Sequence, residues 1–340
     1  MSTIPSERSA KQFKSRHSSV RERLRAFLGI FGHADNVLLP INPDPDSMAS
    51  AVAVKRLLWK RVRRVVIAHL GDIQRLDNRA MVDLLRIQML RLSEVAPDAF
   101  NRRVLVDSQP HHSEILSRFT YDAIIDHHPK LQDWDVDYVD IRPEYGAAAT
   151  ILVEYLRSAK IIPSMKLATA LIYAIKTDTS NFERDVSDAD VRQFQYVFKY
   201  ANLNRLRKIE KSVIRISDLD IYQTALERRL VAKNSLYAHL GEVPSPDVCV
   251  QIADFFMQVY GLGWTYVSGI YDTKLIIILR NDGYRKDAGR LAIQTFGDLG
   301  SAGGHRGAAR AEIPLDHLIQ SGIGVHRPSL ESFVKERLKI

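Results

Sequence analysis

The residues with the clearest chemical potential are Asp126, His127 and His128, which follow an apolar run over residues 121–125. Other acidic side chains also come at the ends of apolar runs: Asp44 and Asp46, Asp107, and Asp178. Carboxylates and imidazole form a ligand set suited to Mn²⁺ or Mg²⁺. Two such cations about 4 Å apart can activate a water for attack on phosphorus. The pattern therefore predicts a metal site for phosphoryl chemistry.

Alternating strand and helix periods surround these residues. Strands are expected at 37–41, 64–70, 104–106 and 123–125, and helices at 47–60, 78–92, 147–158 and 164–175. Such alternation predicts an α/β fold, with a mainly parallel sheet and helices on both faces. Ligands bind beyond the carboxyl ends of strands in these sheets, so we expect the acidic residues to meet at one edge. One isolated Asp favours a helix cap or turn, but four sites with this placement favour a metal centre.

The rest of the chain predicts a multidomain organisation. Residues 1–30 form a basic leader that runs into a first helix, and residues 31–200 form the catalytic domain. The charged helical pattern of residues 201–240 predicts a helical connector. Residues 241–340 predict a smaller α/β domain, with an antiparallel pair at 264–271 and 274–280, a helix at 290–296 and a glycine-rich loop at 300–307.

Composition narrows the class of protein. The 340 residues are 46% hydrophobic and 26% charged, which is typical of a soluble globular protein. The net charge of +8 favours anionic partners without selecting among them. Cys249 is the one cysteine, so a disulfide within the chain and a Cys-based zinc site are excluded, and a cytoplasmic location is expected. The longest apolar run, residues 275–279, is too short to span a membrane, so no membrane partner is expected.

Five motifs in sequence order resemble the DHH phosphoesterases that carry a DHH-associated C-terminal domain, a group that includes nano-RNase or oligoribonuclease-like and 3′-phosphoadenosine 5′-phosphate phosphatase-like enzymes. The resemblance covers roughly residues 30–320. The motifs are Asn42-Pro43-Asp44-Pro45-Asp46, Val106-Asp107-Ser108, Asp126-His127-His128-Pro129, Thr177-Asp178-Thr179 and Gly303-Gly304-His305-Arg306-Gly307.

The resemblance implies two metal ions, usually Mn²⁺, with Mg²⁺ as the alternative. It assigns one ion to Asp46, Asp107, His127 and Asp178, and the other to Asp44 and Asp107. It also implies that His128 faces the scissile phosphate and that Asp126 orients the histidines. For the C-terminal domain it implies substrate binding by Arg280, Gly303, Gly304 and His305. A homodimer is a further expectation from the family.

One position departs from the family pattern. Pro40 stands where the family usually has a histidine, two residues before Asn42. Either water replaces this nitrogen ligand, or another histidine (His69, His111 or His112) reaches in, or the second ion binds weakly. We interpret the three histidines as surface residues or as supports for the ligands.

The resulting prediction is a metal-dependent phosphodiesterase that hydrolyses short oligonucleotides to nucleoside monophosphates. Alternative enzymes are a phosphatase of 3′-phosphoadenosine 5′-phosphate and a linear or cyclic dinucleotide phosphodiesterase. The alternative from another class is a non-catalytic nucleotide-binding protein with a degenerate metal site, which the proline at position 40 suggests.

Overall fold

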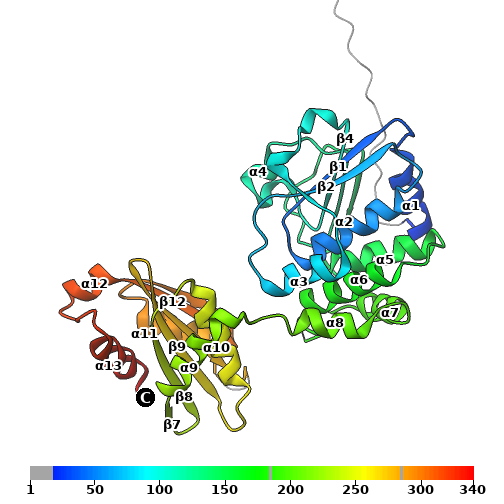
Figure 1. Cartoon of the computed structure of the whole chain (residues 1–340). Helices are drawn as coiled ribbons and strands as arrows, with labels where there is room; N and C mark the ends of the chain where they lie inside the picture. The colour runs from blue at the N-terminus through cyan, green and yellow to red at the C-terminus, as the bar shows by residue number, and fades with distance from the viewer. Residues whose placement is uncertain (1–17, 184–185, 284–285) are drawn as a thin grey trace, which may run out of the picture. The chain divides into compact units, whose positions relative to one another are not determined.

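The computed structural model describes residues 18–183, 186–283 and 286–340. These residues form two compact units that divide between Val213 and Ile214. Each unit is built on a six-stranded sheet, and the strands and helices of both are labelled in Figure 1. We call the N-terminal part unit 1 and the C-terminal part unit 2.

The sheet of unit 1 is entirely parallel, with strand order β3-β2-β1-β4-β5-β6. Its strands are β1 (Asn36–Ile41), β2 (Arg64–His69), β3 (Leu90–Arg91), β4 (Arg102–Val106), β5 (Ala123–Asp126) and β6 (Tyr138–Ile141). The order runs outward in opposite directions from β1 and β4. A crevice at such a reversal point is where open α/β sheets bind ligands.

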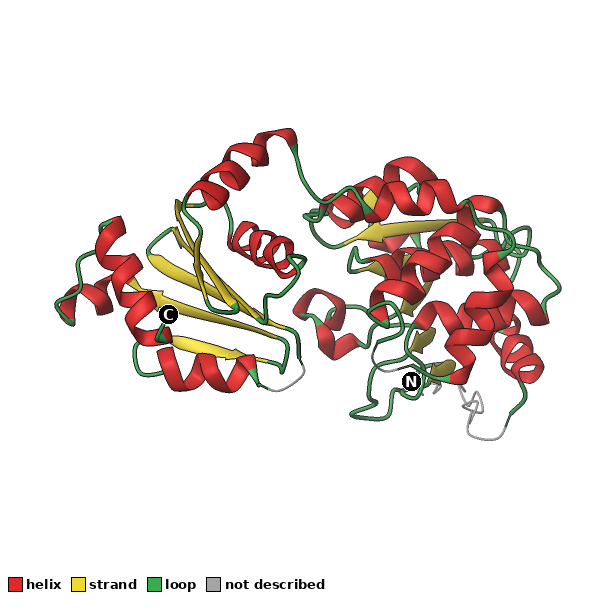
Figure 2. Ribbon diagram, turned by 90° about the horizontal axis from the view of Figure 1, so that it is seen from below, coloured by secondary structure: helices red, strands yellow, loops and turns green. Residues whose placement is uncertain are grey.

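Helices lie on both faces of this sheet, as the two views in Figures 1 and 2 show. They are α1 (Val20–Gly29), α2 (Pro45–Leu57), α3 (Leu76–Leu85), α4 (Glu114–Ser117), α5 (Ala148–Ser158), α6 (Met165–Asp178), α7 (Asp188–Phe198) and α8 (Leu203–Glu210), with short 3-10 turns at Leu92–Glu94, Pro97–Ala99 and Pro110–His112. α2 packs against α5 and α6. Alternate strand residues face opposite cores: Val104 and Val106 join the cluster with α2, while Leu105 joins a cluster with Leu116.

A buried ion-pair network holds β6 to its neighbouring helices. Asp140 and Arg142 are 0% and 4% exposed, and the closest nitrogen–oxygen distance between their side chains is 2.7 Å. Arg142 also pairs with Glu154 of α5 at 2.5 Å, and Arg23 of α1 pairs with Asp140 at 2.6 Å. The network is costly to break, because removal of one partner leaves a buried charge without compensation.

Unit 2 has strand order β11-β12-β10-β9-β8-β7, antiparallel except for the pair β8–β9. Its strands are β7 (Leu230–Ala232), β8 (Ser235–Glu242), β9 (Trp264–Tyr271), β10 (Lys274–Asn281), β11 (Ser301–Gly304) and β12 (Ala308–Pro314). Its helices are α9 (Leu219–Glu227), α10 (Pro246–Met257), α11 (Ala288–Phe296), α12 (Leu315–Gln320) and α13 (Arg327–Leu338), with a 3-10 turn at Ile216–Asp218. Side chains from α10 pack on one face of the sheet and side chains from α11 and α13 on the other.

The fold class predicted from the sequence is confirmed, with local corrections. The helix predicted at 78–92 ends at Leu85, where Arg86 adopts a left-handed φ of 54°, and residues 90–91 form β3. The region predicted as a helical connector, 201–240, holds α8 and α9 but also β7 and most of β8. The predicted glycine-rich loop contains β11, because Gly304 pairs with Ala309 of β12. The basic residues predicted to form a leader lie mostly outside the described residues.

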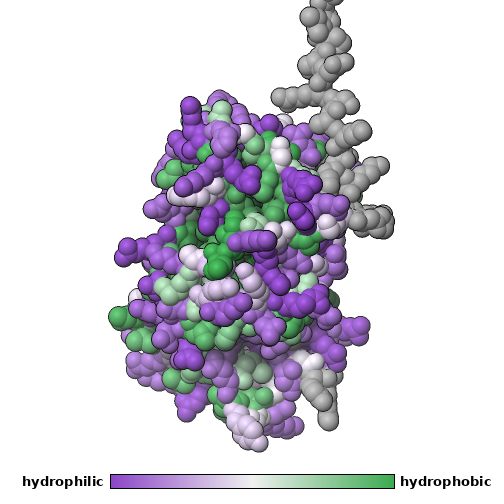
Figure 3. All heavy atoms as spheres, turned by 90° about the vertical axis from the view of Figure 1, so that its right-hand side faces the viewer, coloured by the Kyte–Doolittle hydropathy of each residue, from purple (hydrophilic) through white to green (hydrophobic). Residues whose placement is uncertain are grey.

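In the part of the chain that the structure describes, no helix has the length and apolar character needed to cross a bilayer. Hydrophilic side chains predominate on the face shown in Figure 3, and hydrophobic side chains are interspersed among them.

Candidate metal centre

Three neighbouring strands bring the predicted ligands together at one edge of the unit 1 sheet. Asp44 and Asp46 follow β1, Asp107 follows β4, and Asp126 ends β5, with His127 directly after it. Since β1, β4 and β5 are adjacent and parallel, their carboxyl ends meet at the reversal point of the strand order. The fourth acidic contributor, Asp178, is the last residue of α6.

Four of these side chains form one cluster. The ligand atoms of Asp46, Asp107, His127 and Asp178 all lie within 4.8 Å of one another. His127 Nε2 is 3.2 Å from Asp178 Oδ2, 3.3 Å from Asp107 Oδ1 and 3.9 Å from Asp46 Oδ2. The structure therefore brings together the set that the sequence predicted for one ion.

The imidazole of His127 is oriented by a backbone carbonyl. Its Nδ1 lies 3.1 Å from the carbonyl oxygen of Tyr145. Because a carbonyl oxygen only accepts, Nδ1 carries a proton and Nε2 faces the cluster. His127 Nε2 and Asp107 Oδ1 are both buried without a partner in hydrogen-bond geometry, although they are in contact. Two buried polar atoms left in this way are the arrangement that a cation satisfies, since it displaces any proton on Nε2.

The carboxylate of Asp46 is held by the start of α5. The backbone N–H groups of Ala148 and Ala149 donate to its two oxygens at 2.6 and 2.7 Å. A helix N-terminus favours negative charge. Asp190 of α7 stabilises the segment just before this helix, since its buried carboxylate accepts from the backbone N–H of Gly146 at 2.9 Å.

Electrostatics favour a cation in the cluster. Burial raises the pKa of Asp46, Asp107 and Asp44, and like charge adds to the rise: Asp178 acts on Asp46 and Asp44, and Asp46 acts on Asp107. Burial lowers the pKa of the His127 imidazole, but Asp107 and Asp178 outweigh it and raise this pKa to about 12 in the metal-free cluster. Neighbouring carboxylates that resist ionisation together accept a divalent cation readily, because it neutralises their mutual repulsion.

Asp44, the remaining ligand predicted for the second ion, lies beside Asp107. Asp44 caps α2, where its Oδ1 accepts from the backbone N–H of Ser47 at 2.9 Å, and its predicted role as a metal ligand stays a prediction. Pro40 is buried in β1, at a position that pairs with Ala68 of β2 and lies beyond the β4 pairing, which ends at Leu38. A proline is tolerated there because no β4 partner requires its missing N–H.

Three histidines were considered as substitutes for the missing ligand. The first, His69, uses its Nδ1 in a hydrogen bond of 2.6 Å to the Gly71 carbonyl oxygen. His112 belongs instead to a second group of ligand atoms, with Asp126 and His128. The stacked contact of His111 with Trp134, at a centroid distance of 5.6 Å, places it beside this second group rather than in the acidic cluster.

His128 lies next to the acidic cluster and keeps a reachable side chain, which is 44% exposed. Its Nδ1 is 2.8 Å from Asp126 Oδ1. Burial opposes ionisation of Asp126, but hydrogen bonds from His128 and Gln109 lower its pKa overall. Gln109 and Tyr145 are contributors that the sequence reasoning missed. The only sequence signal for Gln109 is its position two residues after Asp107.

The residues predicted to bind substrate all lie in unit 2. Arg280 is in β10 opposite Ala308 of β12, and its guanidinium pairs with Asp254 at 2.7 Å. Gly303 and Gly304 are in β11, and the turn that contains the exposed His305 leads into β12. Gly304 has a φ of 151°, and a Cβ there would lie 2.3 Å from the Ala308 carbonyl oxygen, so only glycine fits. The β11–β12 turn therefore lies near the end of β10.

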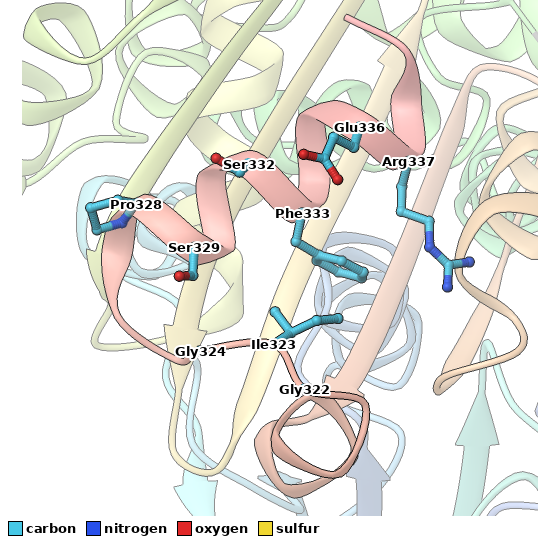
Figure 4. A pocket seen from close by; sticks show the side chains of 9 residues that line it. All are labelled: Gly322, Ile323, Gly324, Pro328, Ser329, Ser332, Phe333, Glu336 and Arg337. Atoms are coloured by element: carbon cyan, nitrogen blue, oxygen red, sulfur yellow. The ribbon is translucent and has the colours of Figure 1, made fainter.

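A separate hollow of about 640 Å³ in unit 2 contains none of the predicted residues. Figure 4 shows it between the segment that follows α12 and helix α13, with Ile323 and Phe333 on its walls. The Arg337 side chain at its edge is already bound to Asp298 and to the Thr295 carbonyl. The chemistry of this hollow gives no reason to assign it to the metal centre.

Comparison with known proteins agrees with the fold. Residues 37–175 match the DHH family, N-terminal domain. An uncharacterised protein of Methanocaldococcus jannaschii is 35% identical over 280 residues, which cover 82% of this chain and 58% of that protein. The crystal structure of an exopolyphosphatase-related protein from Bacteroides fragilis aligns with a TM-score of 0.64 at 14% identity, covering 96% of this chain and 98% of that one.

These comparisons identify the class. Residues 37–175 form a DHH family N-terminal domain, which lies within unit 1 and contains four of the five predicted metal ligands together with Asp126 and His128. The likeness to the Bacteroides fragilis structure extends over both units and concerns the fold alone. The chain spans little more than half the length of its Methanocaldococcus jannaschii relative.

Proposed function

We propose that this protein is a metal-dependent phosphoester hydrolase of the DHH family. The observation that carries the proposal is the convergence of Asp46, Asp107, His127 and Asp178, with two buried polar atoms left without hydrogen-bond partners. The donors are three carboxylates and one imidazole, which suit Mn²⁺ and Mg²⁺. Divalent cations bound there would acidify a water and stabilise negative charge on phosphate oxygens.

The side chains divide the remaining work. Asp46, Asp107, His127 and Asp178 would hold one ion, and Asp44 with Asp107 would hold a second. The half-exposed His128 would face the scissile phosphate through Nε2, while Asp126 keeps the opposite ring nitrogen, Nδ1, engaged.

The substrate class that we propose is a short oligonucleotide, cleaved to nucleoside monophosphates. Unit 2 would act as a DHH-associated domain in which Arg280, Gly303, Gly304 and His305 bind a phosphate or a terminal nucleotide. Backbone N–H groups of glycine-rich turns and arginine side chains both suit phosphate. The Arg280–Asp254 pair would have to open or to share its guanidinium, whose remaining nitrogens can still donate.

The test is incubation of the full chain with Mn²⁺ and a 5′-phosphorylated dinucleotide. Asp107→Ala should reduce turnover to background, and Asp83→Ala, which changes an exposed Asp of α3, should leave it unchanged. Turnover that persists in Asp107→Ala would contradict the proposal. Mononucleotide release supports the oligonucleotide reading. Selective hydrolysis of 3′-phosphoadenosine 5′-phosphate or of a cyclic dinucleotide would favour those alternatives.

A protein that binds nucleotides without catalysis is the alternative from another class, and Pro40 motivates it. Binding of a nucleotide without turnover of any of these substrates in Mn²⁺ would support it. A Pro40→His variant that gains turnover would show that the departure from the family pattern limits activity.

A further inference from the structure

We propose that Gln109 is a positioning residue that fixes the orientation of His128 through Asp126. This inference rests on the proposed function, because it concerns how the phosphate-facing imidazole is held. The three residues come from three places in the chain. Gln109 follows β4, Asp126 ends β5, and His128 lies in the loop after β5.

The contacts form a continuous chain. Gln109 is fully buried, and its Nε2 donates to Asp126 Oδ2 at 2.8 Å. The other oxygen of Asp126, Oδ1, accepts from His128 Nδ1 at 2.8 Å. The same amide nitrogen lies 3.3 and 3.2 Å from the carbonyl oxygens of His128 and Pro129, so it also ties down the backbone of this loop.

The orientation of the Gln109 amide is fixed by its neighbours. An indole N–H only donates, and Trp134 Nε1 is 3.2 Å from Gln109 Oε1. On the other side of the amide, Gln109 Nε2 lies 2.8 Å from the carboxylate oxygen Oδ2 of Asp126, which accepts its N–H. Only one assignment of the amide oxygen and nitrogen satisfies both neighbours. Trp134 therefore orients Gln109, and Gln109 in turn orients Asp126.

The consequence reaches the imidazole. Because Asp126 Oδ1 accepts from Nδ1–H, the other ring nitrogen of His128, Nε2, is left to meet a substrate. Without Gln109, one oxygen of the buried Asp126 loses its partner, and the carboxylate is free to rotate. We expect His128 to sample both tautomers and several ring orientations in that case. Outer hydrogen-bond partners of this kind typically contribute about 10–100-fold to activity.

The experiment compares Gln109→Met with Gln193→Met. Methionine has nearly the length of glutamine but offers no amide. Gln193 is also buried in unit 1, with 4% of its surface exposed. Its Oε1 accepts from Arg157 at 2.7 Å, and neither residue is one of the predicted site residues. Dinucleotide turnover with Mn²⁺ should show kcat lowered roughly 10–100-fold by Gln109→Met with KM little changed. Gln193→Met should change neither.

A readout without activity separates this inference from the proposed function. In Mg²⁺-saturated protein with ¹⁵N-labelled histidine, assigned with His128→Ala, the ring of His128 should give the spectrum of a single Nδ1–H tautomer. Gln109→Met should give a mixed tautomer spectrum, whereas Gln193→Met should not. If no phosphoester is hydrolysed, the proposed function fails, but this spectrum still decides the inference.

Two outcomes would overturn the inference: an unchanged His128 spectrum in folded Gln109→Met, or an unchanged kcat in an active enzyme. Should Gln109→Met fail to fold, Trp134→Phe removes the indole N–H that orients the amide and keeps an aromatic ring. It should lower kcat and broaden the His128 signals, and wild-type behaviour in this variant would equally refute the proposed chain of contacts.

Discussion

Substitution of Asp107 by Asn tests the metal centre without any assumption about substrate. The two side chains have nearly the same shape, so the buried packing is kept while the negative charge is removed. Burial and Asp46 raise the pKa of Asp107 above its unfolded value. A carboxyl with a raised folded pKa destabilises the folded state at any pH above its unfolded pKa. Metal-free Asp107→Asn should therefore be at least as stable as the wild type at pH 7.

Added Mn²⁺ should reverse the order of stability. At a free concentration 100 times its Kd, an ion that binds only the folded state stabilises it by about 2.7 kcal/mol. Unit 1 extends to Val213, and for a domain of roughly 200 residues each kcal/mol shifts Tm by about 2–4 °C. The transition of unit 1 in the wild type should rise by roughly 5–10 °C. The same Mn²⁺ concentration should shift Asp107→Asn far less.

Differential scanning calorimetry of the full chain, with and without Mn²⁺, provides the measurement. Asp83→Asn is the matched control, since it removes an exposed carboxylate of unit 1 outside the cluster. An equal Mn²⁺ shift in Asp107→Asn and the wild type would refute Asp107 as a ligand. A wild type that gains no stability from Mn²⁺ or Mg²⁺ would refute the metal centre itself.

Three further perturbations test other parts of the molecule. Burial lowers the pKa of His239 to about 4, below its unfolded value. The free energy of unfolding of unit 2 should therefore be unaffected by this group above about pH 6.5 and fall by up to roughly 1.4 kcal/mol per pH unit towards pH 4. His239→Gln should flatten this pH dependence in urea unfolding. Arg142→Met removes the buried guanidinium that binds both Asp140 and Glu154 and should destabilise unit 1 by about 3–5 kcal/mol in the same assay. Gly289→Ala places a Cβ 2.5 Å from the Gly304 carbonyl oxygen, so it should shift the β11–β12 turn and lower the free energy of unfolding of unit 2 by about 1–3 kcal/mol. It should also raise KM for the dinucleotide and leave the Mn²⁺-induced Tm shift of unit 1 unchanged.

Each perturbation has a control or a contrary outcome. An unchanged pH dependence in His239→Gln would show that another group causes it. Arg118→Met removes an exposed pair with Glu114 and should cost no more than about 1 kcal/mol, and an equal loss in the two arginine variants would contradict the buried-network account. Wild-type stability in Gly289→Ala would show that the turn moves aside at no cost.

Much of the candidate metal centre could be predicted from the sequence because its predicted ligands follow strands and helices with clear apolar periods. A carboxylate just beyond a buried parallel strand must lie at the carboxyl edge of the sheet. The family motifs around Asp46, Asp107 and His127 then specified the ligand set that the structure brings together. Three of the missed strands have a weak local signal: two-residue β3, edge strand β7 and the glycine-rich β11 lack an apolar alternation of their own. The longer β8 was missed as well, because the predicted connector extended to residue 240.

What the sequence by itself determined is the chemistry available: oxygen and imidazole ligands at the ends of elements, in an α/β chain. Only the tertiary structure decided that β4 lies between β1 and β5, which sets the acids within reach of one another. It also decided which neighbours prepare them, since the N-terminus of α5 binds Asp46, the Tyr145 carbonyl orients His127, and Gln109 holds Asp126. These partners are distant in sequence or carry no motif, because a backbone N–H, a carbonyl or a buried amide acquires its role only from the position that folding gives it.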